Sequence, residues 1–362
     1  MQTLLSEDQI NFKTKISNFT NKYFTAKKDL KPFLHSLYTE QLYSENITFM
    51  EKVLLVESVS KINCGVGLYL LTQFACIEIL QIFGTETQKN NHLKDLISGK
   101  KISTFCLTEE NAGSDISQIN TTAKVEHDLF NISGSKIWSS NGEIADMFFL
   151  FAQCNEIGDK KGISCFLCQT SPNINIHSSS PKIGIKITPS NKIDFKDLKI
   201  KKESLIQNVG DGIKIALSTI SVGRVLCAAQ AVGLLSGILE ESAKHSKKRN
   251  QFGKSISDFQ TIQWYLADMQ KDLDASKLLC YKAAWAKENN PSEFQKLSSM
   301  AKYYATESAS IHSNKAIQIH GGKGLTEGSL ISSSLTDAKV LEIYEGTNEI
   351  QKSILQRELN LI

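Results

Sequence analysis

The spacing of apolar residues changes twice along the chain, and these changes divide it into three regions. Residues 1–104 carry apolar residues at helical spacing, residues 105–205 carry short apolar runs separated by turn residues, and helical spacing returns from about Gly212. No linker rich in Pro, Gly or Ser separates the regions. We therefore predict an α+β protein with a helical N-terminal domain (1–104), a central β-barrel or β-sandwich domain (105–205) and a C-terminal four-helix bundle (206–362).

Individual elements follow from the same patterns. Helices are expected from Met50, from Leu68 to Ile82 with a stop at Gly84, from Pro291 to His320 and from Glu349 to Leu359. One long helix is expected from the apolar face formed by Phe259, Ile262, Leu266, Met269, Leu273 and Cys280. Strands are expected where apolar residues alternate, at residues 131–138 and 183–188, and Glu126-His127-Asp128 is interpreted as a hairpin turn.

The composition is that of a globular protein and argues against several classes of function. Hydrophobic residues make up 41% and charged residues 22% of the chain, and a net charge of +3 from scattered residues gives no basis for nucleic-acid binding. The densest basic run, residues 244–249, is interpreted as a solvated helix end. The most apolar stretch, residues 66–83, contains Gln73, Glu78 and Gln81 and is interpreted as a buried helix rather than a membrane span.

The eight cysteines mostly lie inside apolar runs, which is typical of reduced, buried thiols in a cytoplasmic protein. Cys165 and Cys168 form a C-x-x-C inside an expected strand, without a second pair or a histidine cluster, so we expect neither a zinc site nor a redox motif. The seven histidines are dispersed, and no metal site is expected. Residues 1–30 lack the apolar core of a secretory signal, and the glycine patterns of Rossmann and phosphate-loop sites are absent from the sequence.

Four segments stand out as a set. They are residues 105–115 (FCLTEENAGSD), 134–142 (GSKIWSSNG), 249–253 (RNQFG) with Gln260 downstream, and 318–322 (QIHGG) followed by 337–339 (DAK) and 343–350 (IYEGTNEI). In this order, in a helix–β–helix chain, they resemble the acyl-CoA dehydrogenase family. The resemblance extends from about residue 50 to the C-terminus. It implies that family's fold, an oxidoreductase acting on a CH–CH group of a small acyl thioester, FAD as cofactor and an electron-transferring flavoprotein as electron acceptor.

The resemblance also implies an FAD site built from two sets of residues. The set in the β-domain comprises Phe105, Leu107, Thr108, Gly113, Ser114, Trp138 and Ser140. The set expected to reach the FAD of a neighbouring subunit, in a homodimer or homotetramer, comprises Arg249, Gln251, Phe252, Gln318, Gly321 and Gly322. Thr347 and Glu349 are assigned to the cofactor as well.

The chemistry of these side chains agrees with the assignment. An indole such as Trp138 can stack on the flavin ring, and Ser140, two residues along the same strand, can face the ring's N5 edge. A glycine admits a pyrophosphate, and a guanidinium binds it with paired hydrogen bonds. Taken alone, Trp138 would be interpreted as an ordinary core tryptophan, and Arg249 could equally well be a surface arginine.

Glu345 is predicted to be the catalytic base. Removing a proton α to a thioester carbonyl requires a carboxylate on one face of the carbon chain, while the flavin N5 takes the β-hydride on the other. When substrate excludes water, the pKa of this carboxyl should rise. Some relatives place the base at the position of Gly223, where a glycine cannot serve. The resemblance assigns the substrate to Ser114, Lys186, Thr188, Arg224, Tyr344 and Gly346.

The chain departs from the family pattern near the substrate, which leaves alternatives open. Glu110-Asn111 replaces Pro-Gly, Thr336 replaces an arginine, Lys186 and Thr188 stand where the family has Arg and Ser, and residues 30–47 are shortened. One alternative to acyl-CoA is an acyl group on an acyl carrier protein, steered by a basic rim of Lys182, Lys186 and Lys192. The others are an oxidase that uses O₂ directly and a structural homologue without flavin.

Overall fold

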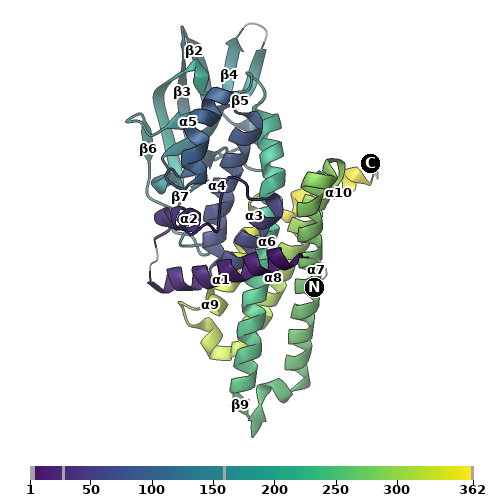
Figure 1. The fold of residues 1–362 in the computed structure, drawn as a ribbon. Helices are drawn as coiled ribbons and strands as arrows, with labels where there is room; N and C mark the ends of the chain where they lie inside the picture. The colour runs from purple at the N-terminus through teal and green to yellow at the C-terminus, as the bar shows by residue number, and fades with distance from the viewer. Residues whose placement is uncertain (1–4, 27–28, 158–159, 360–362) are drawn as a thin grey trace.

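The computed structural model describes residues 5–26, 29–157 and 160–359, and its helical and sheet regions pack side by side (Figure 1). The N-terminal helices are α1 (Glu7–Ala26), α2 (Lys31–Thr39), α3 (Phe49–Ser60), α4 (Cys64–Phe83) and α5 (Glu86–Ile97). Thr48 and Thr85 begin α3 and α5 with capping boxes, and Gly84 follows the last residue of α4. The helices expected from Met50 and from Leu68 to Ile82 are confirmed.

Helix α4 and the long helix α6 (Gly212–Lys248) form the centre of the helical core. Both are long and apolar enough to cross a membrane, but 83% and 89% of their most apolar segments are buried inside the fold. Apolar helices that are buried all round are typical of the core of a large domain. Residues from both helices belong to one continuous apolar cluster, so the N-terminal and C-terminal helices share a core.

The strands form an eight-stranded sheet in the order β6-β7-β3-β2-β4-β5-β8, with β1 paired in parallel to β4. They are β1 (Ser103–Cys106), β2 (Thr122–Glu126), β3 (Leu129–Ser140), β4 (Met147–Ile157), β5 (Lys160–Gln169), β6 (Ile174–Ile176), β7 (Ser190–Lys201) and β8 (Leu205–Ile206). Strands β2 and β3 pair antiparallel around His127 and Asp128, which confirms the hairpin turn. Cys165 and Cys168 lie in β5, and all eight cysteines are free and buried. Among the described residues no cluster of side chains can hold a metal ion.

The expected strand at residues 183–188 is wrong. Within this described segment no residue belongs to a strand, although Ile185 is buried and Ile183 is 70% exposed. The backbone N–H of Ile185, which has φ +51°, donates to Oδ1 of Asp337 (2.6 Å) in helix α9 (Leu330–Ile343). Gly184 packs against the backbone of Thr336. The segment therefore takes its contacts from a helix rather than from a neighbouring strand.

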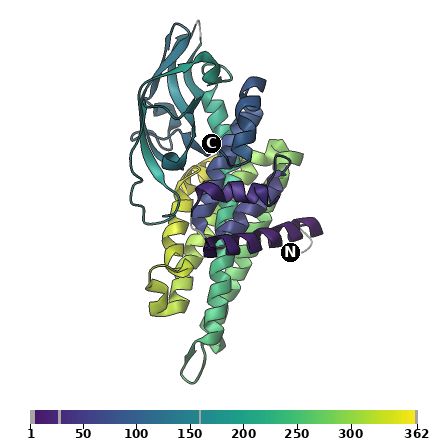
Figure 2. The same cartoon turned by 60° about the vertical axis from the view of Figure 1, so that its left-hand side comes forward.

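The remaining helices build the bundle. After α6 come the short strands β9 (Asn250–Gln251) and β10 (Lys254–Ser255), then α7 (Gln260–Asn289), α8 (Pro291–His320), α9 and α10 (Asn348–Glu358). Pro291 is the first residue of α8, where its missing N–H costs nothing. Helix α6 contacts α7, α8 and α9 of the bundle as well as α3 and α4 of the N-terminal region. Figures 1 and 2 show the β9–β10 hairpin at the end of α6 and α7 that is far from the sheet.

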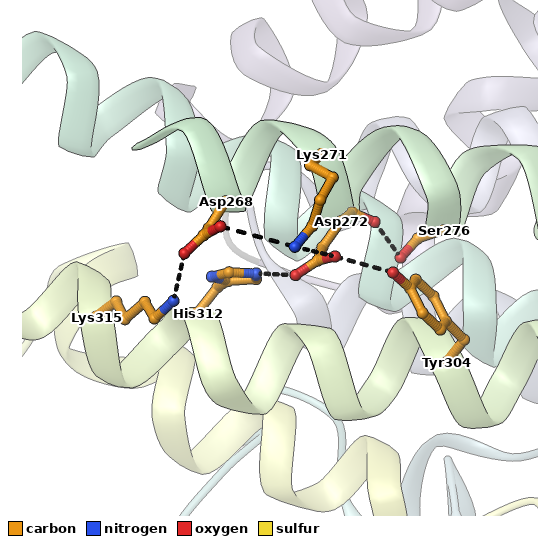
Figure 3. Close-up of polar contacts among 7 residues, drawn as sticks. All are labelled: Asp268, Lys271, Asp272, Ser276, Tyr304, His312 and Lys315. Carbon is orange, nitrogen blue, oxygen red and sulfur yellow. Dashed lines mark hydrogen bonds and ion pairs between the residues drawn. The ribbon is translucent and has the colours of Figure 1, made fainter. Parts of the chain in front are cut away.

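A polar network joins α7 to α8 (Figure 3). Asp272 accepts hydrogen bonds from Nε2 of His312 (2.7 Å) and from the hydroxyl of Tyr304 (2.9 Å), and Asp268 pairs with Lys315 (3.2 Å). Burial lowers the pKa of His312, although Asp272 acts in the opposite direction. Since Asp272 only accepts, the proton of the ring lies on Nε2. The network fixes α8 lengthwise against α7.

Candidate active site

Glu345 lies in the short loop that joins α9 to α10. Glu345 (φ +57°) and Gly346 (φ +84°) both have a left-handed backbone, which is uncommon for a non-glycine residue and often marks a functional site. On one side of Glu345, the hydroxyl of Tyr344 donates to Gln230 on α6. On the other side, the hydroxyl of Thr347 caps the first turn of α10. The loop is therefore held at both ends.

Helix α6 provides room for the Glu345 carboxylate at Gly223. A Cβ atom at Gly223 would lie 2.5 Å from Cδ of Glu345 and closer still to Oε2. The next residue, Arg224, is 4% exposed, and its Nε has no hydrogen-bond partner in the described part of the chain. The position at which some relatives place their base is thus filled by the carboxylate of Glu345. This supports the prediction that Glu345 acts alone.

The surroundings of Glu345 favour proton transfer at neutral pH. Burial raises the pKa of Glu345 to about 7, although the cations of Arg224 and Lys302 act in the opposite direction. Burial also lowers the pKa of Arg224, whose guanidinium nevertheless stays charged. A carboxyl group with a pKa near neutrality can both accept and release a proton, as a general base must.

Replacing Gly223 with alanine is expected to slow catalysis without unfolding the protein. The three atoms nearest the new methyl group all belong to the far end of the flexible Glu345 side chain, which can move aside at little cost to stability. The displaced carboxylate should then reduce the rate of flavin reduction by about 10²-fold, because small misplacements of a reacting group are costly. Stopped-flow reduction measured together with a thermal melt tests this. An unchanged rate at equal FAD content would contradict the placement of the carboxylate against Gly223.

Sequence analysis missed two residues that hold this loop. The ammonium group of Lys302, on α8, donates to the carbonyl oxygens of Glu342 and Gly346 and to Oδ1 of Asn348, each at 2.9 Å. Nε2 of Gln351 donates to the carbonyl oxygen of Gly346 (2.8 Å). No sequence signal marked Lys302, because the buried face of α8 around it also carries polar residues such as Ser298 and Thr306.

Several of the residues predicted to contact FAD lie around the ends of β1 and β3. The backbone N–H of Ile137 donates to the carbonyl oxygen of Thr108 (2.9 Å), which joins the two sequence motifs. Trp138 has φ +56°, lies at an irregularity in the pairing of β3 with β7 and is 56% exposed. Ser140 is also accessible, whereas Ser139 between them is buried. A half-exposed indole on a strand end is available to a flat ligand.

The other residues of this set line the same region. Phe105 lies in β1 and packs on Phe151 of β4, with ring centroids 4.9 Å apart, and Leu107 is 6% exposed. Gly113 and Ser114 are exposed in the loop that follows. Apart from its two chain neighbours, no described residue has an atom within 4 Å of a Cβ built at Gly113. The loop therefore leaves open space beside its backbone.

The residues predicted to meet the substrate carrier differ in exposure. Lys186 is exposed, but Thr188 is buried and its hydroxyl donates to the carbonyl oxygen of Gly65 (2.5 Å) at the start of α4. The Thr188 hydroxyl thus faces α4, and its contact with substrate stays a prediction. Glu349 is exposed in the first turn of α10.

The β9–β10 hairpin presents the residues expected to act across an interface. Phe252 (φ +53°) and Gly253 (φ +78°) form its two-residue turn, with the positive angles of a type I′ turn. Phe252 is 93% exposed. Arg249, directly before the hairpin, and Gln251, within it, are also exposed. Within its own subunit Phe252 meets Phe259 edge-on, with ring centroids 6.1 Å apart. A bulky residue that is nevertheless held in a left-handed, almost fully exposed turn supports a contact outside the subunit.

The second part of the interface set lies at the same end of the bundle. Gln318, Gly321 and Gly322 are exposed at the C-terminus of α8 and in the turn that follows. The rings of His320 in α8 and His245 in α6 stack with centroids 4.3 Å apart, which brings this turn close to the end of α6. The hairpin end of α6 lies far from the sheet (Figures 1 and 2). The FAD residues of the β-domain and the residues of the interface set are therefore far apart within one subunit. This is the arrangement that an FAD site shared between two subunits requires.

Comparison with known proteins identifies the family. The acyl-CoA dehydrogenase N-terminal, middle and C-terminal domain families match residues 33–100, 104–198 and 210–360. The chain belongs to the acyl-CoA dehydrogenase family. It is 35% identical over 309 residues to a short-chain specific acyl-CoA dehydrogenase of Clostridium acetobutylicum, covering 85% of this chain and 81% of that protein.

Two solved structures resemble the fold closely. Butyryl-CoA dehydrogenase from Megasphaera elsdenii is 32% identical with a TM-score of 0.89, covering 98% of this chain and 99% of that one. A prolyl acyl carrier protein oxidase, AnaB, is 26% identical with a TM-score of 0.90, covering 99% of this chain and 100% of that one. The predicted fold class, the FAD dependence and the oxidation of a CH–CH group in an acyl thioester are confirmed at the level of the family.

The side chains of this acyl-CoA dehydrogenase fit an FAD molecule. Trp138 offers an exposed aromatic face, and the Gly113 backbone is uncovered. Each of these features is unfavourable or unused in the protein alone and suits a bound ligand.

Proposed function

We propose that this enzyme oxidises a short-chain acyl thioester between Cα and Cβ, and that Glu345 removes the α-proton. The observation that carries the proposal is the Glu345 carboxylate itself, which is seated against Gly223 and has its pKa raised to about 7 by burial. Arg224, which directly follows Gly223 in α6, places a positive charge beside this carboxylate. The similarity to short-chain specific relatives supports a small acyl group.

Each residue of the site would have a distinct role in the reaction. Trp138, Ser140 and the loop at Gly113 would hold the FAD, which when bound supplies the acceptor for the β-hydride. Glu345 accepts the α-proton and becomes a neutral carboxylic acid. The charges of Arg224 and Lys302 hold the carboxylate ionised until that transfer, because nearby cations favour the charged form. The left-handed backbone at Glu345 aims its side chain at α6 rather than at solvent.

The carrier of the acyl group is proposed to be coenzyme A, with an acyl carrier protein as the second candidate. The similarity to AnaB and the replacement of Pro-Gly by Glu110-Asn111 support the acyl carrier protein as this second candidate. One of the three lysines of the expected basic rim is not available to a partner. Nζ of Lys182 turns inward and donates a hydrogen bond to the carbonyl oxygen of Thr188 (2.5 Å). Lys186 and Lys192 remain exposed to steer an acidic partner.

Anaerobic flavin bleaching tests the function and the carrier together. Butyryl-CoA and the same acyl group on a carrier protein are mixed with the holoenzyme, and absorbance of the flavin is followed. We expect fast bleaching by butyryl-CoA. Bleaching by the loaded carrier alone would replace coenzyme A with the carrier protein, and bleaching by neither would reject the proposed activity. Hydrogen peroxide measured against reduction of an artificial acceptor separates an oxidase from a dehydrogenase.

The proposal also covers the oligomeric state, the electron acceptor and the cellular compartment. Trp264, Leu278 and Trp285 lie at multiples of seven residues along α7 and are 59%, 49% and 53% exposed, which supports a homodimer or homotetramer. We propose an electron-transferring flavoprotein as the acceptor. Eight free, buried thiols support a reducing, cytoplasmic location.

A further inference from the structure

Lys302 is an unusual lysine for the core of a helical bundle. It lies in the middle of α8 and is fully buried. Its three N–H groups are matched by three acceptors, the carbonyl oxygens of Glu342 and Gly346 and Oδ1 of Asn348, each at 2.9 Å. None of these acceptors is a carboxylate. A buried cation without a directly bonded anion is costly, so its presence calls for a reason beyond packing.

The three acceptors surround the catalytic loop. Glu342 is in the last turn of α9, Gly346 directly follows Glu345, and Asn348 begins α10. A second donor on α8, the hydroxyl of Thr306, also reaches Oδ1 of Asn348 (3.0 Å). One side chain therefore ties the end of one helix, the loop and the start of the next helix to α8.

We propose that Lys302 is a positioning residue for the catalytic base: its ammonium group fixes the loop on both sides of Glu345, and its charge keeps the Glu345 carboxylate ionised. This inference rests on the proposed role of Glu345. The loop carbonyls supply the hydrogen bonds that a buried ammonium group needs, and the carboxylate supplies the nearby negative charge. The left-handed backbone of Glu345 is uncommon, and such a conformation persists only where its surroundings enforce it.

The other groups around Glu345 do not take over this role. Arg224 approaches from α6 and stays charged throughout. Cys227 on α6 and Cys76 on α4 have thiol pKa values raised by burial, to about 12 in the case of Cys227, so both are neutral near pH 7. The hydroxyl of Tyr344 has a pKa raised by burial and is neutral as well. Lys302 is thus the second of two cations that lower the pKa of Glu345.

The test compares four variants of the full-length holoenzyme. Lys302→Met removes the charge and the donors, Lys302→Gln removes the charge but keeps a donor, and Lys302→Arg keeps the charge. Lys315→Met is the matched control, because Lys315 lies on the same helix and pairs with Asp268 on α7 instead (Figure 3). The titration of Glu345 is followed directly by infrared difference spectroscopy, with Glu345→Gln identifying its carboxyl band.

In the wild type the band should titrate around the pKa of about 7. Removing a cation favours the neutral acid, so the midpoint should move upward by about one pH unit in Lys302→Gln and Lys302→Met. The rising limb of flavin reduction against pH should move by the same amount. Lys302→Arg and Lys315→Met should keep the wild-type midpoint.

Two outcomes would overturn the inference: an unmoved midpoint in folded Lys302→Gln, or an equal movement in Lys315→Met. If Lys302→Met does not fold, Lys302→Gln decides alone. The infrared titration needs no turnover, so a failure of the proposed function, seen as no bleaching of wild-type flavin by any thioester, is distinguished from a failure of the role of Lys302.

Discussion

Replacing Glu345 with glutamine is expected to leave the protein folded and yellow while flavin reduction by substrate falls by about 10²–10⁴-fold. Glutamine has nearly the same shape as glutamate but cannot accept the α-proton. The fall should approach or exceed the upper end of this range, because Gly223 occupies the position at which a second base could stand. Stopped-flow absorbance under anaerobic conditions measures the rate.

Glu327→Gln is a suitable control, because Glu327 is exposed in the loop before α9. The flavin of the Glu327→Gln variant should be reduced by substrate at the wild-type rate. If Glu345→Gln also retained the wild-type rate, another base or another reaction would have to be sought.

Replacing Arg249 with alanine is expected to weaken FAD binding by about 2–4 kcal/mol, because a pyrophosphate charge loses its partner. This corresponds to a roughly 30- to 900-fold higher dissociation constant. The backbone of Arg249 is held by hydrogen bonds with His245 (2.9 Å) and Ile256 (2.8 Å), so truncating the side chain should not disturb the hairpin. FAD release on dilution, followed by fluorescence, measures the change. Lys248→Ala removes the neighbouring exposed cation and should retain FAD.

Mixing the two impaired variants, at an FAD concentration that leaves Arg249→Ala largely without cofactor, shows whether Arg249 acts across an interface. An oligomer assembled from Arg249→Ala and Glu345→Gln subunits would contain one site in which an intact Glu345 meets an intact Arg249 from the other subunit. We expect partial recovery of activity in the mixed oligomer. No recovery, or an equal affinity for FAD in Arg249→Ala and wild type, would place Arg249 outside the shared site.

The sequence was sufficient for the elements whose pattern is local. Helix α8 was predicted with both ends correct, because Pro291 permits a helix start and glycines follow His320. The β2–β3 hairpin was predicted because turn residues interrupt alternating strands. Residues 183–188 were mistaken for a strand because alternation can also arise where one isoleucine is buried against a helix and the next is exposed.

The candidate active site shows the same difference between local sequence patterns and contacts made by distant segments. The motif around Glu345 made it the candidate base from the sequence alone, because family resemblance is carried by short runs of residues. The sequence could not place the Glu345 carboxylate against Gly223, which lies on a helix more than a hundred residues earlier.

By itself, then, the sequence determined the order of helices and strands, the family and the candidate for the base, since these depend on residues close together in the chain. Only the tertiary structure decided that a lysine on α8 ties down the loop, that Arg224 lies beside the carboxylate and that the Thr188 hydroxyl faces α4. The physical reason is that burial, charge proximity and hydrogen-bond partners arise from segments distant in sequence, which no local pattern records.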